Sequence, residues 1–129
     1  MATIFSKIIK GEIPSYKIAE DDDYYAFLDI NPLVKGHTLV IPKEEVDYIF
    51  DMDPEALAGM TKFAQKVAAK IKKSIDCKKV ALMVIGLEVP YAHIHLVPIN
   101  KMSDVDFSRE KLKLTTEEFE EVKDRIAHS

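Results

Sequence analysis

Two histidines that lie two residues apart are the side chains best suited to chemistry in this sequence. They occur in the apolar stretch Tyr91-Ala-His-Ile-His-Leu-Val-Pro98. Because side chains alternate between the two faces of a β-strand, we expect His93 and His95 on one face, about 6.5 to 7 Å apart along the chain. Tyr91 is expected on the same face, and the apolar residues between these three should face the core. The stretch therefore predicts a strand with one core-facing side and one imidazole-bearing side.

A pair of histidines on a strand has three interpretations, and the pattern alone leaves them open. The rings can be ordinary polar groups of a solvated sheet face. They can bind a metal, but structural zinc needs four N or S ligands and catalytic zinc at least three. Only His37 and carboxylates could complete such a set. They can also be catalytic: neutral imidazole can attack phosphorus while a partner cation neutralises the nonbridging oxygens.

A nucleophilic histidine needs one ring nitrogen to donate to a fixed acceptor, so that the other nitrogen presents its lone pair. A backbone carbonyl near His93 would serve as that acceptor.

Composition limits the other classes of function. A chain of 129 residues with 47% apolar residues can bury one core without disulfides. The net charge of -4 argues against nucleic acid as a partner but not against a small anionic ligand. Cys77 is the single cysteine, which excludes an intramolecular disulfide and fits a reducing cytoplasm. No apolar run approaches the about 20 residues of a bilayer span, so neither a membrane nor an export segment is expected.

The helices and strands that must position the histidines are predicted from the spacing of apolar residues and from the Gly and Pro residues that end each element. Apolar spacing predicts a short helix over residues 4–9, ahead of Gly11 and Pro14. Residues 15–20 and 23–30 are typical of a hairpin, and residues 37–41 form a third strand that ends at Pro42.

The second half of the chain predicts two helices and two strands. Asp53 and Pro54 begin a long helix that runs to about residue 74. The apolar run 80–85 predicts a strand covered on both faces, paired antiparallel with residues 91–98 in the sheet centre. A capping box at 115–118 begins a helix at about 116–127, and residues 101–114 should be irregular. The fold class is α+β: a five-stranded, mostly antiparallel sheet with a short N-terminal helix, one long helix and a C-terminal helix.

Three segments resemble the histidine triad (HIT) family in their order along the chain. Residues 91–97 match six of the seven positions of the signature His-φ-His-φ-His-φ-φ, where φ is apolar. The other two are Thr3-Ile-Phe-Ser-Lys-Ile-Ile-Lys-Gly-Glu-Ile-Pro14, and Phe27-Leu-Asp-Ile-Asn-Pro followed by Gly36-His-Thr-Leu-Val-Ile-Pro-Lys43. The chain is similar to the Hint-like phosphoramidase and hydrolase branch. We therefore expect one HIT-like domain over residues 1–129, with a core at 3–98 and a C-terminal extension at 99–129.

The resemblance implies a catalytic set of His93, His95 and His37. His93 occupies the position that attacks the α-phosphorus and forms a covalent nucleotidyl intermediate, and His95 the position that contacts phosphate oxygens. His37 matches a further histidine near the phosphate, although it could equally be a polar residue at the start of a strand.

The resemblance also implies a nucleotide-binding set. Asp29 matches the carboxylate that accepts hydrogen bonds from both ribose hydroxyls, and its alternative is a turn-opening Asp. The remaining members enclose the nucleotide in the family but could simply be core residues: Ile4, Phe5, Ile8, Phe27, Ile30 and Val89.

Two departures from the family pattern concern catalysis. Tyr91 replaces the first triad histidine, and tyrosine, with a pKa of about 10, is a poorer proton shuttle at neutral pH. Glu88 stands in a segment where many members have Gly-Gln-Ser, and it would bring negative charge near a phosphate.

A third departure concerns metal. A zinc-binding branch has Cys-x-x-Cys, a later His and the first triad His as ligands, and this chain has Thr3, Ser6, Glu45 and Tyr91 there. We therefore predict no bound zinc and no cofactor.

The sequence thus predicts a nucleotide hydrolase or nucleotidyl transferase. It would act on the α-phosphate of nucleoside phosphoramidates or related nucleotide esters through a covalent nucleotidyl-histidine. The alternative is a catalytically weak or inactive purine nucleotide-binding module. A third hypothesis is an interaction protein whose sheet face is a partner surface, and metal-dependent hydrolysis ranks below all three. The expected partners are a purine nucleoside monophosphate or nucleotide conjugate and a second copy of the chain in a homodimer.

Overall fold

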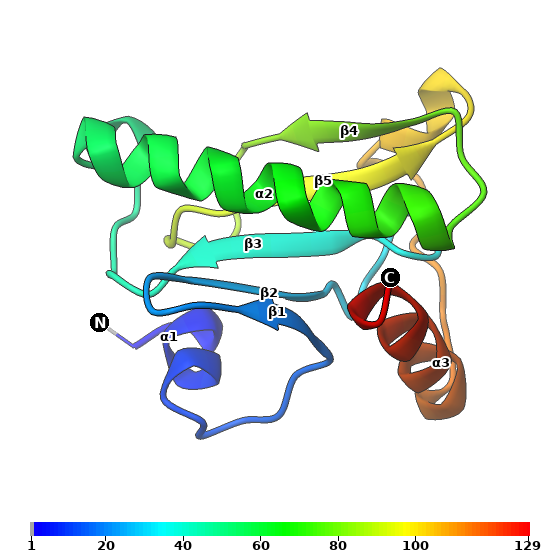
Figure 1. Ribbon diagram of the computed structural model, residues 1–129, viewed down its shortest axis with the longest axis horizontal. Helices are drawn as coiled ribbons and strands as arrows, with labels where there is room; N and C mark the ends of the chain where they lie inside the picture. Colours follow the sequence, from blue (N-terminus) through cyan, green and yellow to red (C-terminus); the bar gives the residue numbers. More distant parts are fainter. Residues whose placement is uncertain (1) are drawn as a thin grey trace.

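A five-stranded sheet, antiparallel throughout, forms the centre of the molecule, in the order β1-β2-β3-β5-β4. The computed structural model describes residues 2–129. The strands are β1 (Lys17–Glu20), β2 (Tyr24–Leu28), β3 (Thr38–Pro42), β4 (Lys79–Met83) and β5 (Ile94–Ile99). The α-helices are α1 (Ile4–Ile9), α2 (Pro54–Ser74) and α3 (Thr116–Ala127), and two 3-10 turns are η1 (Ile49–Asp51) and η2 (Met102–Val105) (Figure 1). The predicted α+β fold class is confirmed.

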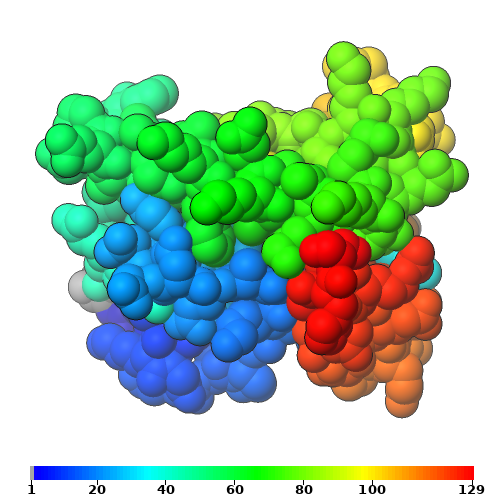
Figure 2. All heavy atoms as spheres, viewed as in Figure 1, coloured from blue at the N-terminus to red at the C-terminus, as the bar shows by residue number. Residues whose placement is uncertain are grey.

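Helices cover the two faces of the sheet unequally. α2 and α3 pack on one face, where they enclose the larger core cluster together with Ala26, Val40 and Ile94. Figure 2 shows α2 and α3 side by side over this face. On the opposite face α1 contributes Phe5 and Ile8 to a smaller cluster. This second face remains partly open, which leaves space for a ligand.

Alternation along two neighbouring strands explains why both faces of the sheet are apolar. In β3, Val40 belongs to the helix-covered core, whereas Leu39 and Ile41 belong to the cluster beneath α1. In β5, Ile94 and Leu96 face the helices. Because neighbours alternate, His95 points away from these helices, on the face opposite Ile94 and Leu96 as predicted, and this is the face on which α1 lies.

The long helix follows its sequence signals closely. The Asp53 side chain accepts a hydrogen bond from the Glu55 N–H, and Pro54 occupies the first turn. The buried stripe recurs at helical spacing: Met60, Phe63, Ala64, Val67 and Ile71. The β1–β2 hairpin also forms as predicted.

The strand near residues 80–85 was predicted to lie in the centre of the sheet and to be covered on both faces. Both predictions were wrong. β4 pairs antiparallel with β5, as expected, but it is an edge strand and spans Lys79–Met83. Leu82 is 51% exposed. A continuous apolar run indicates that both faces of a strand are apolar. It does not show whether residues of the same chain bury both faces.

The strand that carries the histidines also begins later than predicted. β5 starts at Ile94 rather than at Tyr91. Before it, the Tyr91 N–H donates to the Val89 carbonyl and the Ala92 N–H to the Val46 carbonyl. These bonds hold residues 91–93 in a turn outside the sheet ladder, so His93 sits at the entrance of the strand.

Within residues 2–129, no helix is long and apolar enough to cross a membrane.

Gly59 of α2 gives a test of the packing between α2 and the sheet. The Tyr24 hydroxyl donates to the Ala56 carbonyl at 2.6 Å, and a Cβ at position 59 would overlap that hydroxyl and lie 3.2 Å from the ring Cζ. Ala normally favours a helix over Gly by about 1 kcal/mol. We nevertheless expect Gly59→Ala to lower the free energy of unfolding by about 1 to 2 kcal/mol, because Tyr24 must move.

Urea denaturation of Gly59→Ala, Tyr24→Phe and the double variant checks this expectation. In the Tyr24→Phe background the Gly59→Ala substitution should cost little or become stabilising. A gain in stability from Gly59→Ala in the original chain would contradict the packing argument.

Candidate functional site

A cavity of about 420 Å³ opens on the α1 side of the sheet. Pockets of this size bind small molecules. It is lined by almost all the residues singled out from the sequence: Ile4, Phe5, Ile8, Phe27, Asp29, Ile30, His37, Glu88, Val89, His93 and His95. The tertiary structure therefore brings together residues from α1, β2, β3, β5 and the loop before β5.

Several apolar residues belong both to the core beneath α1 and to the wall of the cavity. Phe5, Ile8 and Phe27 are buried members of the cluster beneath α1 and also form cavity wall. Ile4 and Ile30 are 46% and 57% exposed. These two apolar side chains border the cavity where a ligand could cover them.

His93 is held in a tautomer that suits a nucleophile. Its Nδ1 lies 2.6 Å from the Tyr91 carbonyl oxygen. Because a carbonyl only accepts, the hydrogen bond assigns the ring hydrogen to Nδ1 and leaves the lone pair on Nε2. The Phe5 ring packs edge-on against the imidazole at 5.0 Å between centroids, which restricts its rotation.

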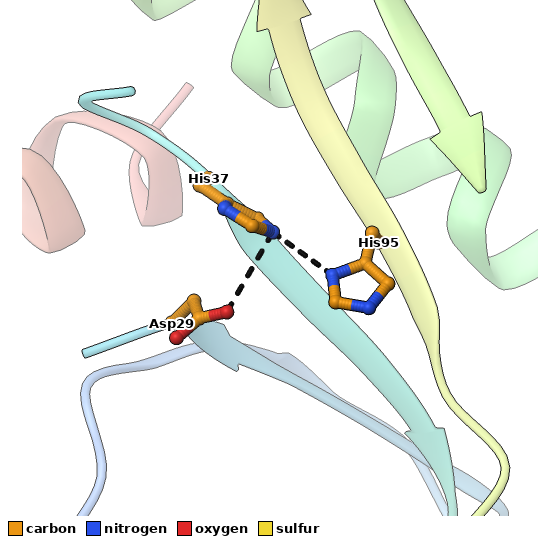
Figure 3. A group of neighbouring side chains, drawn as sticks. All are labelled: Asp29, His37 and His95. Atoms are coloured by element: carbon orange, nitrogen blue, oxygen red, sulfur yellow. Dashed lines mark hydrogen bonds and ion pairs between the residues drawn. The ribbon is translucent and has the colours of Figure 1, made fainter. Parts of the chain in front are cut away.

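His37 and His95 form a directed chain of hydrogen bonds between β3 and β5 (Figure 3). The backbone N–H of Leu33 donates to Nδ1 of His37 at 3.0 Å, so the hydrogen of that ring is on Nε2. This Nε2 lies 3.0 Å from Nδ1 of His95 and donates to it. The remaining hydrogen of His95 is then on its own Nε2, available to a ligand oxygen.

Burial keeps these rings neutral at physiological pH. It lowers the pKa of His37 to about 3, with a smaller contribution from the neighbouring His95. It lowers the pKa of His95 to about 4 and also lowers that of His93. The catalytic interpretation calls for a partner cation beside the attacking imidazole, but His95 is a neutral N–H donor.

Asp29 follows β2 and makes the turn-opening contact that was one of its two interpretations. Its Oδ1 accepts from the Asn31 N–H at 2.8 Å, which is a turn-opening contact, and its Oδ2 lies 3.6 Å from Nε2 of His37. Burial raises the pKa of Asp29 to about 6, against the Asn31 hydrogen bond and the positive charge of Lys111. The carboxyl group faces the cavity and retains free acceptor positions.

Tyr91 lies behind the cavity wall rather than in the lining. It is 1% exposed, and its hydroxyl donates to the Pro42 carbonyl at 2.5 Å. Burial raises the pKa of Tyr91 to about 12, with a contribution from Glu45. The side chain at position 91 is therefore a buried anchor whose hydroxyl is engaged by the Pro42 carbonyl.

Two further positions that correspond to zinc ligands in one branch of the family, Thr3 and Ser6, carry hydroxyl groups that are already engaged. The Thr3 and Ser6 side chains cap α1 by bonding to each other's backbone N–H groups. With Tyr91 engaged by Pro42, these oxygens offer none of the N or S donors that a structural zinc site prefers.

Asp29, His37 and His95 place one potential ligand atom each within 4.8 Å of the others. The Leu33 N–H occupies the Nδ1 lone pair of His37, which keeps a hydrogen on the Nε2 that a metal would need. This arrangement favours hydrogen bonding over metal binding.

Phe107 and Lys111 belong to the site but were missed from the sequence. Both line the cavity, although they lie in the segment expected to be merely irregular. The Phe107 ring packs edge-on against His95 at 5.0 Å between centroids. The one available signal was that Phe107 is the only aromatic residue between 101 and 114.

The fold and the histidine arrangement are those of a nucleotide-binding class of proteins, and comparison with known proteins agrees. Residues 10–102 match the HIT domain, so the chain belongs to the HIT family. An uncharacterized HIT-like protein of Borreliella burgdorferi is 39% identical over 132 residues, covering 96% of this chain and 95% of that protein. Adenosine 5'-monophosphoramidase HNT1 of Saccharomyces cerevisiae is 40% identical over 100 residues, covering 75% of this chain and 62% of the yeast protein.

A solved structure gives the same result for the fold. The Hit-like protein involved in cell-cycle regulation from Bartonella henselae, crystallised with an unknown ligand, superposes with a TM-score of 0.83 at 35% identity. The match covers 98% of this chain and 95% of that one.

The hydrogen-bond chain predicts the state of each ring. We expect His37 and His95 to be neutral at pH 6 with hydrogen on Nε2, and His93 to be neutral at pH 7 with hydrogen on Nδ1, because burial disfavours imidazolium. Long-range ¹H–¹⁵N NMR of the imidazoles measures both properties. In His37→Phe the partner of His95 is lost, and its tautomers should mix. A doubly protonated His37 or His95 at pH 6 would contradict the assignment.

Proposed function

We propose that this chain is a HIT-type hydrolase that acts on the α-phosphate of nucleoside phosphoramidates or related nucleotide esters. The observation that carries the proposal is the hydrogen bond from Nδ1 of His93 to the Tyr91 carbonyl, which leaves the Nε2 lone pair free on a ring that lines the cavity. Neutral imidazole is the reactive form, and burial lowers the pKa of His93.

The proposed ligand occupies the cavity in three parts. The purine lies between the apolar residues of α1 and β2, and the ribose hydroxyls donate to Asp29. The α-phosphate lies at His93, where the Nε2–H of His95 donates to a nonbridging oxygen. A bound phosphate would also favour the protonated form of His95, because an anion stabilises a neighbouring cation.

The proposed reaction has two steps. Nε2 of His93 attacks phosphorus, and the bond from phosphorus to the leaving amine or alcohol breaks. Water then attacks the nucleotidyl-histidine, and the nucleoside monophosphate leaves with the neutral ring restored. In the first step the leaving group takes a proton from solvent, and in the second the attacking water releases one as it becomes the new hydroxyl of the phosphate, so that one water molecule is consumed overall.

A catalytically weak or inactive purine nucleotide-binding module is the second candidate. Two observations favour it: the hydroxyl of Tyr91 is buried and engaged, and Glu88 brings a carboxylate into the cavity lining. Neither feature alters the apolar wall or Asp29, which would hold the base and the ribose, but both stand where the family has groups that could assist turnover.

We also propose that two copies form a homodimer through α2 and β4, and that the protein works in the cytoplasm. A groove between these elements is lined mainly by small and apolar residues, including Ala58, Ala68, Val80 and Leu82. β4 is an edge strand, whose unpaired backbone groups can bond to a second copy. The single free cysteine, Cys77, suits a reducing compartment.

Replacing the nucleophile tests the enzymatic proposal. We expect His93→Ala to release AMP from an adenosine phosphoramidate at least about a thousandfold more slowly than the original chain. His128→Ala, at the exposed end of α3, is the matched control and should retain the rate. Intact-mass analysis during turnover should show a nucleotidyl adduct that His93→Ala lacks. AMP binding without turnover or adduct in the original chain would favour the binding module instead.

A charge on the exposed edge tests the dimer. Leu82→Glu should shift the protein to a monomer in sedimentation equilibrium, because the carboxylate would be buried in the interface. Leu112→Glu, at an exposed apolar residue outside the groove, should leave the mass unchanged. A dimer that persists in Leu82→Glu would place the interface elsewhere.

A further inference from the structure

A C-terminal segment outside the matched HIT domain forms one wall of the site. It comprises residues 103–114, and backbone contacts attach it to the loop that follows Asp29. The Arg109 guanidinium donates to the carbonyls of Ser103 and Leu33, and the Leu112 N–H donates to the Pro32 carbonyl at 2.9 Å. The segment is therefore fixed relative to the residues that the proposed function assigns to the ribose.

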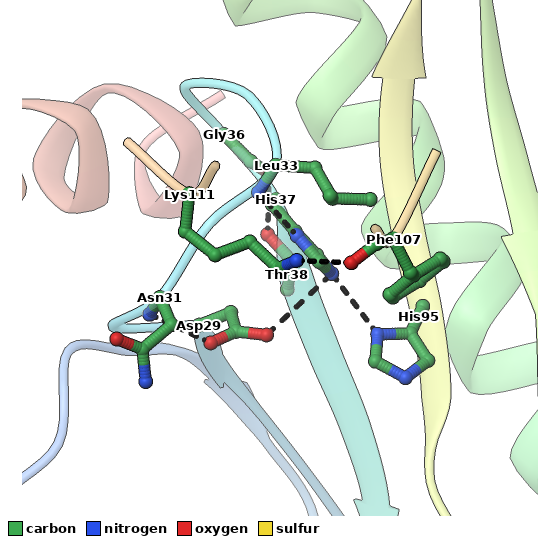
Figure 4. A network of polar contacts seen from close by, with 9 residues as sticks. All are labelled: Asp29, Asn31, Leu33, Gly36, His37, Thr38, His95, Phe107 and Lys111. Carbon is green, nitrogen blue, oxygen red and sulfur yellow. Dashed lines mark hydrogen bonds and ion pairs between the residues drawn. The ribbon is translucent and has the colours of Figure 1, made fainter. Parts of the chain in front are cut away.

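Lys111 is the cation that this segment brings to the cavity. Its Nζ donates to the backbone carbonyls of Phe107, at 2.5 Å, and Arg109, at 3.2 Å. In the part of the chain that the structure describes, no carboxylate lies within 4.0 Å of this ammonium. Figure 4 shows its side chain reaching into the network of Asp29, His37 and His95. Neutral carbonyls orient the ammonium but do not neutralise its charge.

The other charged and titratable groups around Asp29 do not supply a positive charge. His37, which precedes β3, and His95, from β5, are kept neutral by burial. Glu88, from the loop before β5, is negative and favours the protonated form of Asp29. Lys111 is the one cation whose charge opposes the burial of Asp29 among residues 2–129.

We propose that Lys111 is a specificity-determining residue for ribose: its ammonium, oriented by the Phe107 and Arg109 carbonyls, shares the cavity with Asp29 and favours the carboxylate that accepts both ribose hydroxyls at once. This inference rests on the proposed function. Hydrogen bonds to an ionised acceptor are about twice as strong as those between neutral groups. A protonated carboxyl also carries a hydrogen that competes with one ribose hydroxyl. The charge of Lys111 therefore favours ribonucleotides over nucleotides that lack these hydroxyls.

Calorimetry with two ligands tests the role of Lys111. The ligands are AMP and 2',3'-dideoxy-AMP, measured at pH 6 and pH 8 with the original chain, Lys111→Met, Lys111→Arg and Lys113→Met. Lys113 is an exposed lysine of the same segment outside the cavity lining, so Lys113→Met is the matched control.

At pH 6 we expect Lys111→Met to weaken AMP binding roughly fivefold, the loss of ionised Asp29 if its pKa rises by about one unit from about 6, and to leave dideoxy-AMP nearly unaffected. The loss should shrink to within about twofold at pH 8, where Asp29 is ionised in both proteins. Lys111→Arg and Lys113→Met should behave like the original chain. Equal weakening of both ligands at both pH values would mean that Lys111 contacts the phosphate, and it would overturn the proposal, as would no effect at all.

A second measurement needs no nucleotide. The ¹³C shift of the Asp29 carboxyl, followed against pH in the unliganded protein, should show a higher midpoint in Lys111→Met and an unchanged one in Lys113→Met. An unchanged midpoint in Lys111→Met overturns the role of Lys111 alone. If the original chain binds no AMP at either pH, the proposed function fails, and the ribose preference fails with it.

Discussion

The pairing of β3 with β5 is the constraint on which the site depends. It places Leu39 opposite His95 and brings the ring of His37, at the start of β3, within 3.0 Å of the His95 ring. The backbone N–H of Leu33 sets the direction of this chain of hydrogen bonds, because an N–H can only donate. Two rings thereby acquire defined tautomers from one backbone group. A shift of register by one residue would turn His95 to the helix-covered face.

Burial determines the protonation states of the side chains that this geometry brings together. In water an imidazole is partly protonated near neutral pH, but in this site the cost of desolvating a cation keeps His37, His93 and His95 neutral. The same desolvation works against Asp29, which is needed as an anion in the proposed function, and the charge of Lys111 opposes it. One low-dielectric environment thus suits the rings and requires a compensating cation for the carboxylate.

Local signals in the sequence were sufficient to predict those elements whose structure depends on residues close together in the chain. The apolar stripe and capping residues of α2, the turn of the β1–β2 hairpin and the alternation around His95 are read from neighbours within a few residues. β4 could not be placed in this way, because an apolar edge strand and an apolar central strand have the same sequence pattern. Its exposed Leu82 is explained only by the sheet order and by the proposed second copy.

The sequence by itself determined the family and the fold class, and it singled out half of the residues that line the cavity. It did so because residue types at fixed spacings carry this information. The tertiary structure decided which ring nitrogen carries each hydrogen, that Tyr91 is an anchor to the Pro42 carbonyl, and that Phe107 and Lys111 join the site. These features depend on contacts between residues far apart in the chain, such as Arg109 with Leu33, and no local pattern encodes such distances.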